Sequence, residues 1–190
     1  SLAIETFDLE FKYLNSEELI FKNINLQIEK NSHTVFTGVN GSGKSTLLGL
    51  LAGVYFPTSG KVLSTSSNSG FVGPNPLIFS GSLRENLIYG NKNNLNDREI
   101  LDVANKFNLF GKDSNLDLDK KINNKNLSSG QMQKIAFIRV MLSKVEILFL
   151  DESTSNLVEE TKKYIFNLLK NRKLTVINST HDIESFNTID

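Results

Sequence analysis

Hydrophobic and polar residues alternate in two runs near the start of the chain. Residues 9–13 read Leu-Glu-Phe-Lys-Tyr, and residues 24–28 read Ile-Asn-Leu-Gln-Ile. A period of two is typical of strands with one buried face, so we expect a strand in each run. Residues 15–18 supply a polar turn between them. Residues 61–63 then predict a further short strand, after a turn at 56–60.

A helical period replaces this alternation in the middle of the chain. Asn96 resembles an N-cap because Glu99 follows it three residues later, and apolar residues come next at steps of three or four. The same spacing predicts a helix at about 130–142 and another that includes residues 157–168. The polar residues 111–126 are most simply a solvated loop.

Two apolar runs, at 145–150 and 174–178, predict strands, and the first suits a buried parallel strand. Strands that alternate with helices indicate a doubly wound α/β core. We assign this core to residues 1–75 and 143–190. The predominantly helical residues 76–142 would form an inserted subdomain.

The composition excludes some classes of protein but does not identify a ligand. The 190-residue chain carries 21 basic and 21 acidic residues, so its formal net charge is zero and does not point to nucleic acid or an anionic membrane. Cysteine is absent, which excludes disulfides and cysteine metal sites. The longest apolar run, at 47–56, is too short to cross a bilayer. We therefore expect any role at a membrane to depend on a partner.

Residues 38–46, Gly-Val-Asn-Gly-Ser-Gly-Lys-Ser-Thr, fit the pattern G-x-x-x-x-G-K-[ST] of a phosphate-binding loop. A predicted strand enters the loop and a predicted helix leaves it. Backbone N–H groups and the positive end of this helix would bind the anion, while a ligand-free glycine-rich turn is the alternative. Lys44 would contact the β- and γ-phosphates, and Ser45 would bind Mg²⁺. The predicted ligand-binding residues are Gly38, Asn40, Gly41, Ser42, Gly43, Lys44, Ser45 and Thr46.

Asp151 and Glu152 follow the predicted strand at 145–150, and ligands lie at this end of parallel strands. Asp151 suits the Mg²⁺ shell, and Glu152 suits polarisation of an attacking water. Taken alone, such an acidic pair is often only a helix cap. His181 follows the last predicted strand and could reach the γ-phosphate, although a lone histidine there is usually a surface or capping residue.

Residues 127–131, Leu-Ser-Ser-Gly-Gln, precede and open the predicted helix at 130–142. A helix start rich in serine and glycine can bind an anion, and it can equally be an ordinary cap.

These motifs, in this order, resemble the nucleotide-binding domain of an ABC transporter of the exporter type, over essentially the whole chain. Residues 38–46 match the Walker A loop, and residues 147–152 match Walker B with its catalytic glutamate. Residues 127–131 are similar to the signature LSGGQ, and His181 to the switch histidine. Residues 79–87 resemble the segment after the Q-loop of exporters.

The resemblance implies a P-loop NTPase of the ABC type: an α/β, RecA-like core with a small antiparallel β-subdomain and an inserted helical subdomain. It implies a head-to-tail dimer of two nucleotide-binding domains, identical or different, around ATP and Mg²⁺. Hydrolysis would drive export through a fused or separate transmembrane domain, with this domain on the cytoplasmic face of the membrane and no nucleic acid involved. The implied catalytic residues are Glu152, His181 and Lys44; the metal ligands are Ser45 and Asp151; the further nucleotide contacts are Tyr13, Ser128, Ser129, Gly130 and Gln131.

Several positions depart from the family pattern. Pro74 stands where the Q-loop glutamine is expected, Ser129 replaces a signature glycine, and Val158 replaces an aspartate that makes a contact between subunits. Residues 61–71 are shorter than usual, so we expect a reduced β-subdomain. The chain is expected to be part of a longer transporter polypeptide.

Three alternatives remain at this point. The departures favour an ATP-binding regulatory domain that hydrolyses weakly. A soluble ABC ATPase of DNA repair or translation usually carries coiled coils or tandem cassettes, which this sequence lacks. A GTPase would need an Asn-Lys-x-Asp guanine motif, and none occurs.

Overall fold

The computed structural model describes residues 1–38, 43–112 and 115–181. These residues fall into two compact units. Unit 1 comprises Ser1–Phe71, Glu146–Glu152 and the described residues from Phe166 onward, and unit 2 comprises Val72–Val145 and Ser153–Ile165.

An antiparallel sheet in unit 1 is built around the long strand β1 (Leu2–Phe11). Strands β2 (Phe21–Ile24), β3 (Gln27–Glu29) and β5 (Ser59–Ser64) all pair with β1 in antiparallel orientation. Strands are therefore present where the alternating pattern predicted them, and β5 contains the short strand expected at 61–63.

The strand predicted at 24–28 is divided in two between β2 and β3. The strand is interrupted because the Thr6 side chain of β1, and not the regular backbone pairing of a sheet, bonds the chain at this point. The Thr6 hydroxyl donates to the Ile24 carbonyl at 2.9 Å and accepts from the Leu26 N–H at 2.8 Å. The prediction of one continuous strand was wrong at Asn25 and Leu26.

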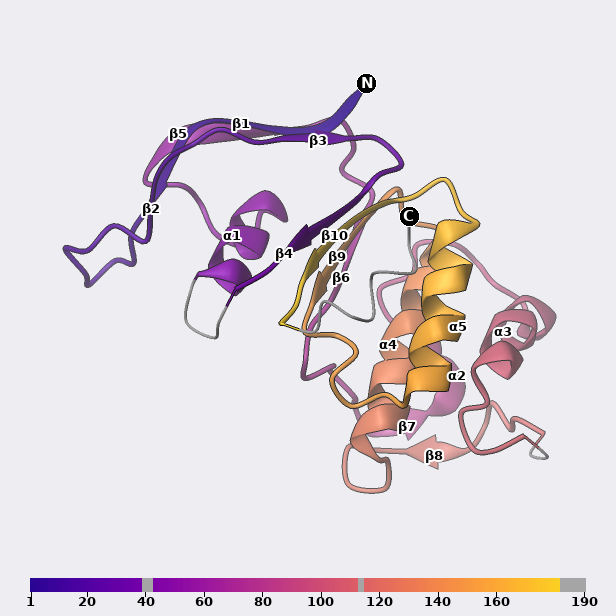
Figure 1. Cartoon of the computed structure of the whole chain (residues 1–190). Helices are drawn as coiled ribbons and strands as arrows, with labels where there is room; N and C mark the ends of the chain where they lie inside the picture. Colours follow the sequence, from indigo (N-terminus) through magenta and orange to yellow (C-terminus); the bar gives the residue numbers. More distant parts are fainter. Residues whose placement is uncertain (39–42, 113–114, 182–190) are drawn as a thin grey trace. The chain divides into compact units, whose positions relative to one another are not determined.

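A second sheet in unit 1 has the order β4 (His33–Phe36), β10 (Thr175–Ser179), β9 (Ile147–Asp151), β6 (Ser69–Val72) (Figure 1). Strand β10 runs parallel to both β4 and β9, and its last residue, Ser179, pairs with Phe36 and with Asp151. The carboxyl ends of these three strands therefore lie at one edge of the sheet.

Helix α1 (Lys44–Leu51) lies between the two sheets of unit 1 (Figure 1). It begins after Gly43, whose φ of 88° is in the left-handed region that glycine adopts without strain. Leu48 and Leu51 belong to one core cluster with residues of both sheets: Ala3, Ile4, Ile28, Ile147, Phe149 and Ile177. Burial of α1 on both sides fixes its first residues relative to the sheet edge.

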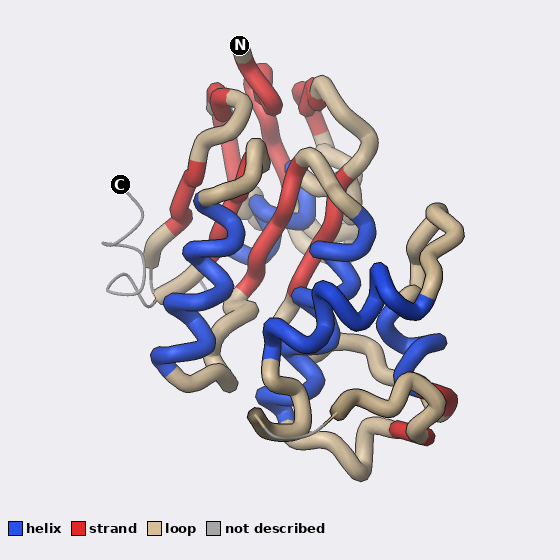
Figure 2. Tube along the Cα trace, turned by 90° about the vertical axis from the view of Figure 1, so that its right-hand side faces the viewer, coloured by secondary structure: helices blue, strands red, loops and turns tan. Residues whose placement is uncertain are grey.

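Unit 2 is mainly helical, and Figure 2 shows its helices in blue. The predicted helices near 97–107 and 130–142 are confirmed. The capping box of Asn96 and Glu99 is also present. The loop expected at 111–126 contains a short strand, which was not predicted because two residues carry no period. The elements are β7 (Gly81–Ser82), α2 (Leu83–Leu87), α3 (Asp97–Ala104), the 3₁₀-helix η1 (Asn105–Phe107), β8 (Lys121–Ile122) and α4 (Ser129–Ser143).

Within unit 2, polar contacts tie α4 to the segment that begins at Leu77. Arg139 donates to the Asn86 carbonyl and to the Leu77 carbonyl, each at 2.6 Å. The Asn86 side chain in turn bonds both backbone groups of Phe79. Helix α5 (Glu159–Lys170) crosses the division between the units. Across the described residues, every helix falls short of the length and hydropathy that a membrane span requires.

We predict that Leu48→Ala lowers the free energy of unfolding by about 2–5 kcal/mol, because it leaves a cavity in the core around α1. Leu48 is fully buried. Chemical denaturation followed by circular dichroism measures the change. The control is Val54→Ala, whose side chain is 62% exposed and should change stability by less than about 0.5 kcal/mol. Equal effects of the two substitutions would contradict this account of the core.

Candidate functional site

Three segments of unit 1 meet at the carboxyl edge of the parallel sheet. The Thr180 N–H donates to the Phe36 carbonyl at 3.1 Å, and the Glu152 N–H donates to the Ser179 carbonyl at 2.9 Å. These bonds continue the ladder beyond the ends of β4, β10 and β9. The residues that follow each strand are thereby held next to one another.

The hydroxyl of Ser45, at the start of α1, donates to Asp151 Oδ1 at 3.0 Å. The two predicted metal ligands, 106 residues apart in the sequence, are thus adjacent. Hydroxyl and carboxylate oxygens are ligands that Mg²⁺ accepts. No cluster of three His, Cys, Asp or Glu side chains suited to a metal occurs among the described residues.

The pKa of Asp151 is raised, chiefly because burial penalises the charged carboxylate. The hydrogen bond from Ser45 opposes this shift, and the neighbouring charge of Glu152 adds to it. A divalent cation at this position would favour the ionised form and reverse the shift. Burial thus makes the ionised form of Asp151 costly, and a positive charge beside it would lower that cost.

Lys44, Glu152 and His181 also converge at this edge. Lys44 Nζ lies 3.7 Å from Glu152 Oε1 and donates to the Gly38 carbonyl. The same Glu152 oxygen accepts from the His181 N–H at 3.2 Å and lies 3.1 Å from His181 Nδ1. All three predicted catalytic side chains are brought together, with Glu152 at the centre.

The backbone of Glu152 adopts φ = 47°, in the left-handed region. Residues other than glycine, asparagine and aspartate rarely enter this region, and such conformations gather at functional sites. The bond from the Glu152 N–H to Ser179 holds the conformation in place. In this conformation the Glu152 carboxylate lies 3.7 Å from Lys44 Nζ.

Tyr13 also lies next to the start of α1, where its hydroxyl shares a 2.7 Å hydrogen bond with Thr46 Oγ1. The predicted residues Asn40, Gly41 and Ser42 lie outside the described part of the chain. Ser179, which pairs with Asp151 at the end of β10, was not among the predicted site residues. Its buried hydroxyl has no hydrogen-bond partner among the described residues. The available signal was the change from apolar to polar residues where β10 ends.

In unit 2, the signature-like residues form the start of α4. Ser128 is the N-cap, its hydroxyl accepts from the Gln131 N–H at 3.1 Å, and Gln131 Oε1 accepts from the Ser128 N–H at 2.8 Å. This is a complete capping box. The first N–H groups of a helix have no intrahelical partner, so a cap does not exclude an anion at Ser129 and Gly130.

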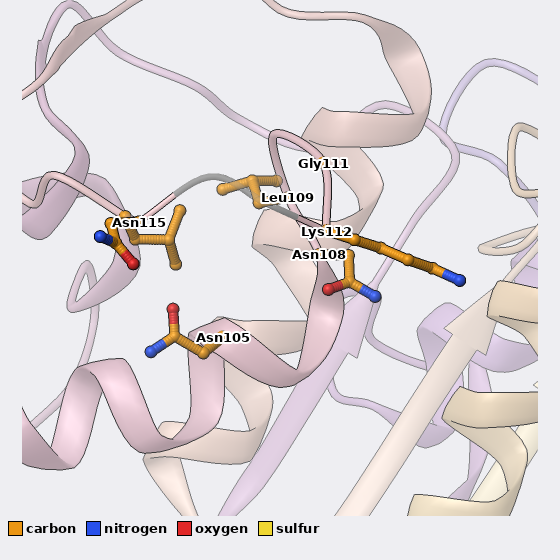
Figure 3. A pocket seen from close by; sticks show the side chains of 7 residues that line it. Asn105, Asn108, Leu109, Gly111, Lys112 and Asn115 are labelled. Atoms are coloured by element: carbon orange, nitrogen blue, oxygen red, sulfur yellow. The ribbon is translucent and has the colours of Figure 1, made fainter.

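Unit 2 also contains a polar cavity of about 190 Å³, and Figure 3 shows side chains that line it. Gln131 Nε2 donates to the Leu109 carbonyl and Lys134 Nζ to the Asn108 carbonyl, each at 3.3 Å. These bonds join the wall of the cavity to α4. Its described lining residues are Asn105, Asn108, Leu109, Gly111, Lys112, Asn115 and Leu116.

Comparison with known proteins identifies the family. The model of the ABC transporter family matches residues 21–155. The chain therefore belongs to the ABC transporter family, as its ATP-binding domain, a domain of the ATPase class. The predicted family is confirmed, and so is the predicted α/β P-loop fold class.

Among similar proteins, the ATP-dependent permease MDL1 of Candida albicans is 33% identical over 213 residues, which cover 96% of this chain and 30% of that protein. The mitochondrial ATP-dependent permease MDL1 of Schizosaccharomyces pombe is 33% identical over 190 residues, 90% of this chain and 26% of that protein. The chain thus spans less than a third of these relatives.

A solved structure of a bacterial Atm1-family ABC exporter with ATP bound superposes with a TM-score of 0.87. The match covers 97% of this chain and 35% of the exporter, with 21% sequence identity. At this identity the comparison shows a shared fold.

We predict that Ser45→Ala raises the pKa of Asp151 further in metal-free protein, because a hydrogen bond that favours the carboxylate is lost while burial remains. Carbon-detected NMR titration of the aspartate carboxyl groups measures the pKa. The matched control is Ser64→Ala in β5, where the hydroxyl donates to the Ser66 carbonyl at 2.8 Å. An unchanged or lower Asp151 pKa in Ser45→Ala would refute the assigned role of this hydrogen bond.

Proposed function

We propose that this chain binds and hydrolyses MgATP and thereby drives export by an ABC transporter. The observation that carries the proposal is the convergence, within unit 1, of Lys44 and Ser45 with the carboxylates of Asp151 and Glu152. A triphosphate needs cationic and N–H donors, its metal needs oxygen ligands, and hydrolysis needs a group that orients water. The carboxyl edge of the parallel sheet offers at least one residue for each of these three requirements.

In the proposed mechanism, Lys44 and the backbone N–H groups at the start of α1 bind the β- and γ-phosphates. Ser45 and Asp151 would hold Mg²⁺, which neutralises charge that develops on the transferred phosphoryl group. The Tyr13 ring would pack against the adenine. Gly38, Gly43 and Thr46 line the same loop and would contact phosphate through their backbone.

Glu152 would orient the attacking water, and His181 would stabilise the reacting geometry from the adjacent strand end. In the structure Lys44 Nζ lies 3.7 Å from Glu152 Oε1. Entry of a γ-phosphate gives Lys44 a stronger anionic partner. Glu152 is then released to accept a proton from water.

We further propose that residues 76–142 act as the signature-bearing helical subdomain. In a head-to-tail dimer, residues Ser128, Ser129, Gly130 and Gln131 of one copy would cover the ATP bound by the other. The exposed helix start at Ser129 supports this role, because it supplies N–H groups and a positive helix end for the γ-phosphate.

The two MDL1 relatives are ATP-dependent permeases, and this chain spans less than a third of their length. We therefore propose a transmembrane partner, fused or separate, that holds this domain at the cytoplasmic face of the membrane. The dimer partner is a second nucleotide-binding domain, identical or different.

A weakly hydrolysing regulatory domain is the second candidate function. Three exposed positions favour it, because Pro74, Ser129 and Val158 differ from the family pattern and Val158 is 68% exposed. An exposed apolar residue there removes a polar contact that a dimer would use. The presence of both Glu152 and His181 at the site favours hydrolysis.

We predict that Glu152→Gln binds ATP with near wild-type affinity, loses at least about 100-fold in turnover, and accumulates as an ATP-bound dimer, because water is no longer activated. Binding and dimerisation are measured on this chain by calorimetry and analytical ultracentrifugation. Turnover is measured on the domain assembled with its transmembrane partner.

The control for this experiment is Glu146→Gln, an exposed glutamate just before β9, which should turn over ATP like the wild type. Full turnover in Glu152→Gln would remove Glu152 from the catalytic role. A wild type that already accumulates as an ATP-bound dimer without turnover would support the regulatory candidate instead.

A further inference from the structure

A buried glutamine of α4 holds the loop that precedes α5. Gln133 is fully buried in unit 2, and its side-chain oxygen accepts a hydrogen bond from the Asn156 N–H at 3.2 Å. Its Nε2 atom has no hydrogen-bond partner among the described residues. Burial of an amide costs free energy unless the amide is hydrogen bonded, and the bond to Asn156 offsets part of this cost.

The Asn156 peptide also contacts α4 through its carbonyl group. A Cβ atom added at Gly130 would lie 3.0 Å from the Asn156 carbonyl oxygen, closer than the separation at which non-bonded atoms attract each other. The signature LSGGQ has glycine at the positions of both Ser129 and Gly130, and this chain has only the second. The contact with Asn156 gives a steric reason for Gly130 that involves no nucleotide.

The loop at 153–158 is closed on itself as well as bonded to α4. The Leu157 N–H donates to the Thr154 carbonyl at 3.0 Å, and both of these residues are buried. Asn156 and Val158, in contrast, are exposed. The loop therefore presents an exposed side that is fixed to the start of α4 through one peptide, with its N–H on Gln133 and its carbonyl over Gly130.

We propose that Gln133 is a positioning residue for the ATP-dependent dimer and acts by holding the Asn156 peptide against Gly130. In that dimer, the start of α4 and the loop at 153–158 of one copy would both meet the other copy. Two segments associate most favourably when they are ordered relative to each other beforehand, because less conformational entropy is then lost on binding. The inference rests on the proposed function, since it concerns how the second copy covers the same ATP site.

The test measures dimerisation of this chain at saturating MgATP by analytical ultracentrifugation, with Glu152→Gln as the reference protein. We expect Gln133→Met, added to the reference, to weaken the dimer at least about 5-fold, because both copies lose a hydrogen bond. Methionine conserves the side-chain volume and removes the acceptor. Hydrogen exchange of the Asn156 amide should become faster, which checks that the bond has been removed.

The affinity for MgADP, measured by calorimetry, separates a positioning role from general damage. It should not change in Gln133→Met, because ADP has no γ-phosphate for a second copy to cover and Lys44, Ser45 and Asp151 all belong to unit 1. The matched control is Ile135→Val, another fully buried change in α4, which keeps the Gln133 acceptor and should dimerise like the reference. Gln133→Leu also removes the acceptor and should repeat the result of Gln133→Met.

Three results would overturn the inference alone. The first is a dimer of reference strength in Gln133→Met although the Asn156 amide exchanges faster. The second is an equal weakening by Ile135→Val or a parallel loss of MgADP affinity. The third is failure of both Gln133 variants to fold, which would make the role of this glutamine structural. A Glu152→Gln reference that binds MgATP and does not dimerise would overturn the proposed dimer and this inference with it.

Discussion

The hydrogen bond between Ser45 and Asp151 is the constraint on which the rest of the site depends. It joins the start of α1 to the end of β9 across 106 residues of sequence. Neither residue is free to move independently. α1 is packed between two sheets, and β9 is held in register with β10, so that Asp151 pairs with Ser179. The geometry of the proposed site is therefore a consequence of how the core of unit 1 is packed.

The same packing fixes the positions of the charged side chains at the carboxyl edge of the parallel sheet. A partly buried carboxylate is costly without a partner, and here Asp151 has the Ser45 hydroxyl while Glu152 has Lys44 and His181. These partners are polar groups that a magnesium triphosphate can replace. Binding of MgATP at the proposed site would exchange these contacts for contacts with phosphate oxygens and the metal ion.

The sequence predicted the motifs and the strand ends well, because glycine spacing and long apolar runs report local structure directly. It missed β6, where Gly70 interrupts any pattern. It joined β2 to β3 because Asn25 and Leu26 keep the alternation, although the Thr6 hydroxyl bonds the Ile24 carbonyl and the Leu26 N–H there. The contact of Tyr13 with Thr46 was also beyond reach, since periodicity carries no information on which strand residue meets which helix residue.

The most direct test of this account is the dependence of ATP affinity on Mg²⁺ concentration, compared between the wild-type chain and Asp151→Asn. If Ser45 and Asp151 hold the metal of a bound triphosphate, Mg²⁺ should strengthen ATP binding by the wild type at least about 10-fold, or about 1.4 kcal/mol. Asp151→Asn should lose that gain and bind metal-free ATP as the wild type does. An equal gain from Mg²⁺ in both proteins would contradict the placement of the metal at the end of β9.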